Sequence, residues 1–259
     1  MKYSLNKVKS SIPKIKAKRD AFWVKLWPRP LSYYFTVIAL NIGLTPNTVS
    51  LISILDALIA SILISIDNQY LIIIGLILLN LFIEFDCIDG MMARTLKKNS
   101  YMGEFYDALG GYTMCAFPLL SVGICAFNTK RVIITLTNTY VLIIFAALGS
   151  ICDILSRLIY QKYTSNEIMS NLQIGKPIKR ENDSFYKEQE KITITYLRLF
   201  IDREFGIGGL FPPLVAFSYM FKCLDIIVIL YSTYHILAYL AVMYIFCRKA
   251  TLFDLNNKK

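Results

Sequence analysis

The sequence predicts an all-α, polytopic membrane protein in which six transmembrane helices follow an amphipathic helix at the membrane interface. Of the 259 residues, 56% are hydrophobic and the mean hydropathy is +0.50, which leaves too little polar surface for a soluble domain of this length. Apolar stretches recur at the length that a bilayer requires. The net charge of +10 comes from Lys and Arg residues that gather on one side of the predicted membrane.

The first predicted helix precedes the transmembrane helices in the sequence. Phe22, Trp23 and Trp27 recur at helical spacing between Lys and Arg residues, which is typical of a helix that lies in the headgroup region. Residues 1–46 are therefore expected to form a basic N-terminal tail and an interfacial helix.

The membrane domain is predicted to cover residues 47–247. A spanning helix needs about 20 mostly apolar residues, and the stretches that meet or approach this length are 47–66, 70–90, 104–127, 131–159, 205–221 and 223–247. The stretch 205–221 is the weakest because Gly and Pro residues crowd its start, although membrane helices tolerate both. A polar cytosolic segment, 161–204, lies within this domain, and residues 248–259 form a cytosolic tail.

The distribution of basic residues predicts the orientation. Residues 1–46, 94–103 and 157–204 hold nine, three and nine Lys or Arg residues, and the tail after 247 holds four, which makes 25 of the 28. With six spans these segments all lie on one side, which the positive-inside rule makes the cytoplasm. Both termini should therefore face the cytoplasm. The mixed charge signs in 161–204 argue against a nucleic-acid partner.

Cysteine and histidine residues give no sign of a metal or disulfide framework. The six Cys residues are scattered, and each lies in or beside an apolar run. We expect them to pack as small hydrophobic residues. The single histidine, His235, is expected to make a contact inside the bundle.

Acidic residues gather at the inner ends of spans two and three. Asp86 and Asp89 are three residues apart, so their carboxylates share one helix face. Gly90 and Ala93 continue that face and leave it flat enough for a ligand to approach. Asp107 lies about one turn into span three, where an antiparallel neighbour can bring it opposite the first pair.

Three carboxylates at a membrane boundary repel one another strongly at low dielectric constant, so a cation or protons must neutralise them. Carboxylate oxygens facing a cytosolic loop favour Mg²⁺ or Mn²⁺ over softer metals. Such a metal keeps positions open for phosphate oxygens, which indicates phosphoryl transfer. The alternative interpretation is a set of interfacial carboxylates that bind no ligand.

The complete pattern resembles a known family. Its fixed positions are Asp86-x2-Asp89-Gly90-x2-Ala93-Arg94-x8-Gly103-x3-Asp107, and this pattern is similar to the signature of the CDP-alcohol phosphotransferases, also called CDP-alcohol phosphatidyltransferases. The segment Thr45-Pro46-Asn47-Thr48 before span one is also common in that family. The resemblance implies transfer of a phosphoalcohol from a CDP-alcohol donor to a hydroxyl acceptor (a lipid, polyol or sugar), with release of CMP.

The resemblance also implies roles for individual residues. The ligands of the divalent metal ions, Mg²⁺ or Mn²⁺, would be Asp86, Asp89 and Asp107. The donor-binding side would be formed by Asp86, Gly90, Ala93, Arg94 and Gly103, of which Gly103 would let spans two and three pack closely. The resemblance further implies a homodimer embedded in membrane lipids.

The chain departs from the family signature at one position. The family places a fourth Asp, generally regarded as the base for the acceptor hydroxyl, where this chain has Gly111. General-base assistance is worth about 10²- to 10⁴-fold in rate. We expect an active transferase in which Asp107 and Glu104 are the catalytic residues, because Glu104 could share the face of Asp107 and take the proton. Arg157, near the inner end of span four, is a candidate to contact a phosphate on the acceptor.

Two other interpretations of Gly111 stay open. The site could bind a CDP-alcohol or a partner without turnover, or the glycine could make room for a bulkier acceptor. A role of the glycine in close helix packing is compatible with all three interpretations.

Overall fold

The computed structural model describes residues 3–13, 20–98, 100–134, 139–173, 203–206 and 208–257. These residues form helices and no strand, so the all-α prediction is confirmed. In chain order the helices are α1 (Leu5–Ser10), α3 (Phe22–Leu26), α4 (Pro28–Asn41), α5 (Pro46–Ser65), α6 (Gln69–Leu96), α7 (Tyr101–Ala116), α8 (Pro118–Thr129), α9 (Tyr140–Gln173), α12 (Phe211–Met220) and α13 (Leu224–Asn257).

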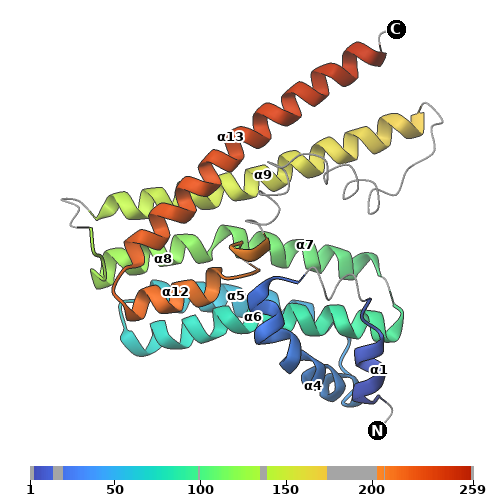
Figure 1. Cartoon of the computed structure of the whole chain (residues 1–259), viewed down its shortest axis with the longest axis horizontal. Helices are drawn as coiled ribbons and strands as arrows, with labels where there is room; N and C mark the ends of the chain where they lie inside the picture. The colour runs from blue at the N-terminus through green and yellow to red at the C-terminus, as the bar shows by residue number, and fades with distance from the viewer. Residues whose placement is uncertain are drawn as a thin grey trace.

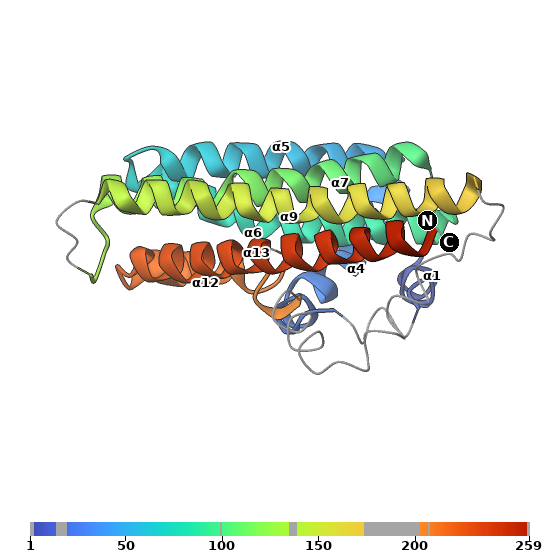
Figure 2. The same ribbon diagram turned by 90° about the horizontal axis from the view of Figure 1, so that it is seen from above.

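The long helices lie lengthwise beside one another, and the two chain termini lie toward the same end of the bundle (Figure 1). The same arrangement is visible from above in Figure 2. α5 packs along α6 and also against α7, while α9 packs along α13. α9 and α13 both continue past the predicted ends of their spans, so the predicted boundary at 247/248 falls within one continuous helix. Most of the predicted polar segment 161–204 lies outside the described residues.

Among the described residues, five helical segments are long and apolar enough to cross a bilayer, which indicates a multi-pass membrane protein. They are Pro46–Ser65, Gln69–Leu96, Tyr101–Thr129, Tyr140–Asn166 and Leu224–Phe253. The third consists of α7 followed by α8. α7 ends at Ala116 and α8 begins at Pro118, because Pro118 has no N–H with which to continue α7. The predicted span 205–221 contains only the ten-residue α12, whose length of about 15 Å is half the thickness of the hydrocarbon core.

The fourth predicted span, 131–159, begins later than its apolar sequence indicated. The backbone N–H groups of Ile133 and Ile134 donate hydrogen bonds to the carboxylate of Asp225, at 3.1 and 2.7 Å. Asp225 is fully buried, and a buried carboxylate needs such donors. These hydrogen bonds hold residues 133 and 134, which are not helical, against the start of α13, and hydropathy could not predict them.

The N-terminal segment both faces the membrane and packs on the bundle. Phe22, Leu26 and Trp27 are exposed, as expected for a helix at the interface. The N–H of Phe22 donates a 2.6 Å hydrogen bond to the carboxylate of Glu204, which lies far along the sequence. α4 packs against α6 and buries Arg29. The segment before α5 is thus part of the folded core.

A close approach of two backbones fixes the position of α6 against α5. A Cβ atom on Gly75 would lie 2.8 Å from the carbonyl oxygen of Ala60 and 3.0 Å from the backbone nitrogen of Ile64. Ala60 and Ile64 are buried. Because small residues let membrane helices approach at backbone distance, this crossing sets how α6 presents its inner half to its neighbours.

We expect Gly75→Ala to lower the free energy of unfolding by about 1–3 kcal/mol, since the added methyl group forces the two backbones apart. Thermal unfolding of the detergent-solubilised protein measures the effect. Gly111→Ala is the matched control, because a Cβ there meets only a side-chain atom at 3.7 Å. Equal stability of the two variants would contradict the proposed crossing.

Candidate active site

The three predicted metal-binding residues lie on two helices. α6 carries Asp86 and Asp89, and α7 carries Asp107. Asp86 and Asp107 are exposed and Asp89 is partly buried. Both Asp86 and Asp107 act electrostatically on the carboxylate of Asp89, so the fold brings the three side chains into one neighbourhood.

Asp89 is held by a residue that sequence reasoning missed. Ser50 of α5 is buried and donates a 2.5 Å hydrogen bond from Oγ to Oδ2 of Asp89. Thr45 caps the start of α5 by accepting a hydrogen bond from the N–H of Thr48, which fixes the first turn, directly before Ser50. The only signal in the sequence was a short polar residue shortly after Thr45-Pro46-Asn47-Thr48, and hydroxyl residues are common in membrane helices.

The side chains around Asp89 do not form a closed metal site. The part of the chain that the structure describes contains no group of three or more His, Cys, Asp or Glu residues arranged to hold a metal ion. The donor set nevertheless fits a hard divalent cation, because it consists of carboxylate oxygens on two helices. Mg²⁺ is usually bound by one or two carboxylates together with waters and substrate phosphates. The arrangement therefore fits a cation whose coordination a phosphate ligand completes.

Gly90 makes room for Arg94. A Cβ atom on Gly90 would lie 3.2 and 3.3 Å from the two terminal nitrogens of the Arg94 guanidinium, which folds back over the glycine. Nε of Arg94 is buried and has no hydrogen-bond partner among the described residues. Ala93 is partly buried, and its carbonyl accepts a hydrogen bond from the N–H of Lys98 at the helix end. The face that was expected to be flat thus carries a cation.

Gly103 lies against α5 and not against α6. A Cβ atom there would lie 3.0 Å from Oγ of Ser100 and 3.4 Å from Oδ1 of Asn47. This corrects the expectation that Gly103 brings spans two and three together, since α5 packs against both. Glu104 lies in the first turn of α7 and is exposed, three residues before Asp107.

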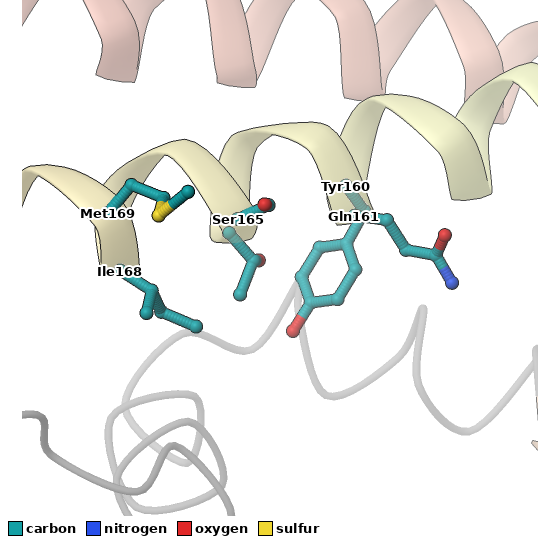
Figure 3. A pocket seen from close by; sticks show the side chains of 6 residues that line it. Tyr160, Gln161, Ser165, Ile168 and Met169 are labelled. Atoms are coloured by element: carbon teal, nitrogen blue, oxygen red, sulfur yellow. The ribbon is translucent and has the colours of Figure 1, made fainter. Parts of the chain in front are cut away.

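A separate hollow of about 350 Å³ lies on one side of α9 (Figure 3). It is lined by Tyr160, Gln161, Thr164, Ser165, Ile168 and Met169. All six belong to the same helix and none is charged, so the hollow offers neither a carboxylate for a metal ion nor a cation for a phosphate.

Comparison with known families places the chain in a family. The sequence model of the CDP-alcohol phosphatidyltransferase family matches residues 43–179, which is more than half of the chain and includes α6 and α7. The chain belongs to this family. A search of curated proteins finds no match. Membership in the CDP-alcohol phosphatidyltransferase family implies a transferase that takes a phosphoalcohol from a CDP-alcohol donor and passes it to an alcohol acceptor.

In this member of the CDP-alcohol phosphatidyltransferase family, Gly111 faces a cation. A Cβ atom on Gly111 would lie 3.7 Å from Nη1 of Arg157 on α9. Nε of Arg157 lies 3.7 Å from Oδ1 of Asp153, one turn earlier on the same helix. Oδ1 of Asp153 also lies 3.5 Å from Nδ1 of His235 on α13, which confirms His235 as a contact between helices. The position expected to hold a fourth acid therefore adjoins a polar cluster of Arg157, Asp153 and His235.

We expect Gly111→Asp to fold normally and to pair with Arg157. The pair should raise the free energy of unfolding by at most about 1 kcal/mol, because the Arg157 side chain is 49% exposed. Thermal unfolding of Gly111→Asp in the wild-type and Arg157→Gln backgrounds completes a double-mutant cycle. The same effect of Gly111→Asp in both backgrounds would show that the two positions do not face each other.

Proposed function

We propose that this protein is an active, divalent-metal-dependent transferase. It moves a phosphoalcohol from a CDP-alcohol to the hydroxyl of a lipid, polyol or sugar and releases CMP. The observation that carries the proposal is the setting of Asp89, whose carboxylate is bound by Ser50 and lies within the electrostatic reach of Asp86 and Asp107. Acids gathered on apolar helices are costly unless they serve a ligand, and the family match supplies the ligand's chemistry.

Mg²⁺ or Mn²⁺ held by Asp86, Asp89 and Asp107 would neutralise the donor diphosphate and stabilise the CMP leaving group. Ser50 fixes the orientation of the Asp89 carboxylate by its hydrogen bond. Arg94, folded over Gly90, places a guanidinium where it can bind donor phosphate oxygens.

The transfer requires a proton acceptor. The acceptor oxygen forms a bond to the phosphorus that carries the alcohol, the bond from that phosphorus to CMP breaks, and the hydroxyl proton must leave the acceptor. We propose that Glu104 accepts this proton. Glu104 is exposed and lies three residues before Asp107 on α7. A carboxylate in this position can act at neutral pH if it lies within hydrogen-bond reach of the bound hydroxyl.

The acceptor is proposed to carry a negative charge. Gly111 leaves open space at the fourth position, and Arg157 faces that space. A guanidinium there would repel a metal ion but would bind a phosphate on the acceptor. Because Gly111 replaces an acidic side chain and leaves space next to Arg157, the site favours a phosphorylated or otherwise anionic acceptor over a neutral polyol.

The second candidate is a homologue that binds CDP-alcohols without turnover, and the absence of an acid at Gly111 is the observation that favours it. For either function we propose that the site and both termini face the cytoplasm, because the basic residues gather there. The homodimer remains a proposal from the family resemblance.

Release of CMP from a panel of CDP-alcohols by the purified protein tests the proposal. We expect release to require Mg²⁺ or Mn²⁺ and to rise with phosphorylated acceptors. Asp89→Asn should lower the rate by about 100-fold or more, since it removes a metal ligand. Asp67→Asn, which changes an exposed acid outside the carboxylate cluster, should have no effect. Nucleotide binding without metal-dependent CMP release would establish the non-catalytic homologue instead.

Ser50→Ala tests the role of the residue that orients Asp89. We expect the Mg²⁺ concentration for half-maximal CMP release to rise about 10- to 100-fold, while the rate at saturating Mg²⁺ changes less. Ser61→Ala removes another buried hydroxyl of α5 that bonds only its own helix and serves as the control. An unchanged Mg²⁺ requirement in Ser50→Ala would separate Ser50 from the metal site.

A further inference from the structure

His235 of α13 and Arg157 of α9 face the same carboxylate oxygen. Oδ1 of Asp153 lies 3.5 Å from Nδ1 of His235 and 3.7 Å from Nε of Arg157. Asp153 and His235 are only 9% and 7% exposed, whereas the side chain of Arg157 is 49% exposed. Nη1 of Arg157 would lie 3.7 Å from a Cβ atom on Gly111. The guanidinium therefore connects a buried pair of an acid and a histidine to the open space beside Gly111.

His235 is held in this place by a close crossing of α9 and α13. One helical turn before Asp153 and His235, a Cβ atom on Gly149 would lie 2.8 Å from Cα of Ser232, so the two backbones nearly touch. The family match covers residues 43–179, and His235 lies beyond it. Family membership therefore assigns no role to this histidine.

The net charge of the cluster depends on His235. When the imidazole is neutral, the charges of Asp153 and Arg157 cancel, and when it is protonated the cluster carries one net positive charge. Histidine is the side chain whose ordinary pKa lies within the physiological pH range. A charge a few ångströms away acts strongly in a partly buried site. An anion beside Gly111 therefore meets a more positive potential when His235 is protonated.

The other groups around the cluster ordinarily titrate at a different pH. Cys115 of α7 is buried and lies within electrostatic reach of the Asp153 carboxylate. On the same helix as His235, the ring centroids of Tyr231 and Tyr234 lie 6.3 and 5.3 Å from that of the imidazole. α8 and α12 also pack against α13, and both consist of uncharged residues. Ordinary pKa values are about 8.5 for a thiol, 10 for a phenol and 3.9 for an aspartate, against about 6.5 for a histidine.

We propose that protonation of His235 raises the affinity of the space beside Gly111 for an anionic acceptor. The protonated imidazole neutralises Asp153, so that the positive charge of Arg157 acts on the acceptor. The neutral imidazole leaves Asp153 to offset Arg157. His235 is thus a positioning residue that acts on the acceptor through its neighbours. The identity of the anion as an acceptor rests on the proposed function, whereas the binding itself needs neither a CDP-alcohol nor a metal ion.

The test measures thermal stabilisation of the full chain in phosphatidylcholine nanodiscs by sulfate, with a chelator present. Sulfate is the probe because its charge stays constant between about pH 5.5 and 8.5, the range in which histidine titrates. Sodium chloride of equal ionic strength corrects for screening. We expect saturable stabilisation, with an apparent dissociation constant that rises about three- to tenfold from the lower to the higher pH. The absence of saturable stabilisation, or an affinity that does not change with pH, would overturn the proposal.

Variants assign the pH dependence to His235. His235→Gln should bind sulfate at every pH as weakly as the wild type does at high pH, and Arg157→Gln should weaken binding at low pH by about tenfold or more. Tyr234→Phe changes a neighbouring ring and keeps the imidazole, so this matched control should retain the wild-type pH dependence. If His235→Gln fails to fold, the wild-type pH profile and Arg157→Gln carry the test. A folded His235→Gln that keeps the pH dependence, or an unchanged affinity in Arg157→Gln, would refute the role of His235.

The assay of CMP release separates this proposal from the proposed function. Sulfate binding that depends on His235, without CMP release, would retain the role of the histidine in a homologue without turnover. CMP release together with pH-independent sulfate binding would overturn the role of the histidine alone. Where CMP is released, the same pH dependence should appear in KM for a phosphorylated acceptor and not in KM for the CDP-alcohol.

Discussion

The structure depends on one constraint, which is that a charged group taken into an apolar helix bundle is costly unless another polar group matches it. Asp225 is satisfied by backbone N–H groups of the loop before α9. Asp89 is matched by Ser50, and Asp153 lies 3.7 Å from Arg157. The first two pairs join segments that lie far apart in the sequence, whereas the third lies within α9. Asp225 and Asp89 thus tie neighbouring parts of the bundle together, and the candidate site inherits its geometry from these ties.

The same constraint joins segments outside the family match to one another beside α6. Glu204 accepts a hydrogen bond from the backbone of Phe22 and pairs with Arg203 at 2.8 Å. Arg29 pairs with Asp20 at the same distance. These contacts join the chain before α5 to the chain before α12 and hold both beside the inner half of α6. One side of the candidate site is therefore closed by segments that the family match does not include.

The sequence predicted the features that depend on a local pattern of residues. It did not predict the features that depend on a contact with a residue far away in the sequence. Apolar length predicted α5 and the starts of α6 and α13 closely, and the spacing of Asp86 and Asp89 placed both acids on α6 beside the acid of α7. Hydropathy could not reveal that Asp225 would accept hydrogen bonds from the non-helical residues Ile133 and Ile134. It also could not show that the polar partner of Asp89 would be Ser50 or that Arg94 would cover Gly90. These features arise from tertiary contacts between residues whose types are individually common.

The surroundings of Gly111 argue for altered recognition of the acceptor and against simple decay. Loss of an acid from a site built around it would leave its cationic neighbour buried and unmatched, which is destabilising. Here Arg157 is 49% exposed and has Asp153 beside it on its own helix, so the cluster is electrostatically consistent without an acid at 111. A Cβ atom at position 111 would lie 3.7 Å from Nη1 of Arg157, so an anion that enters this space meets a guanidinium. A position that once required a base can then serve to hold the acceptor, provided that the proton leaves by way of another carboxylate on α7.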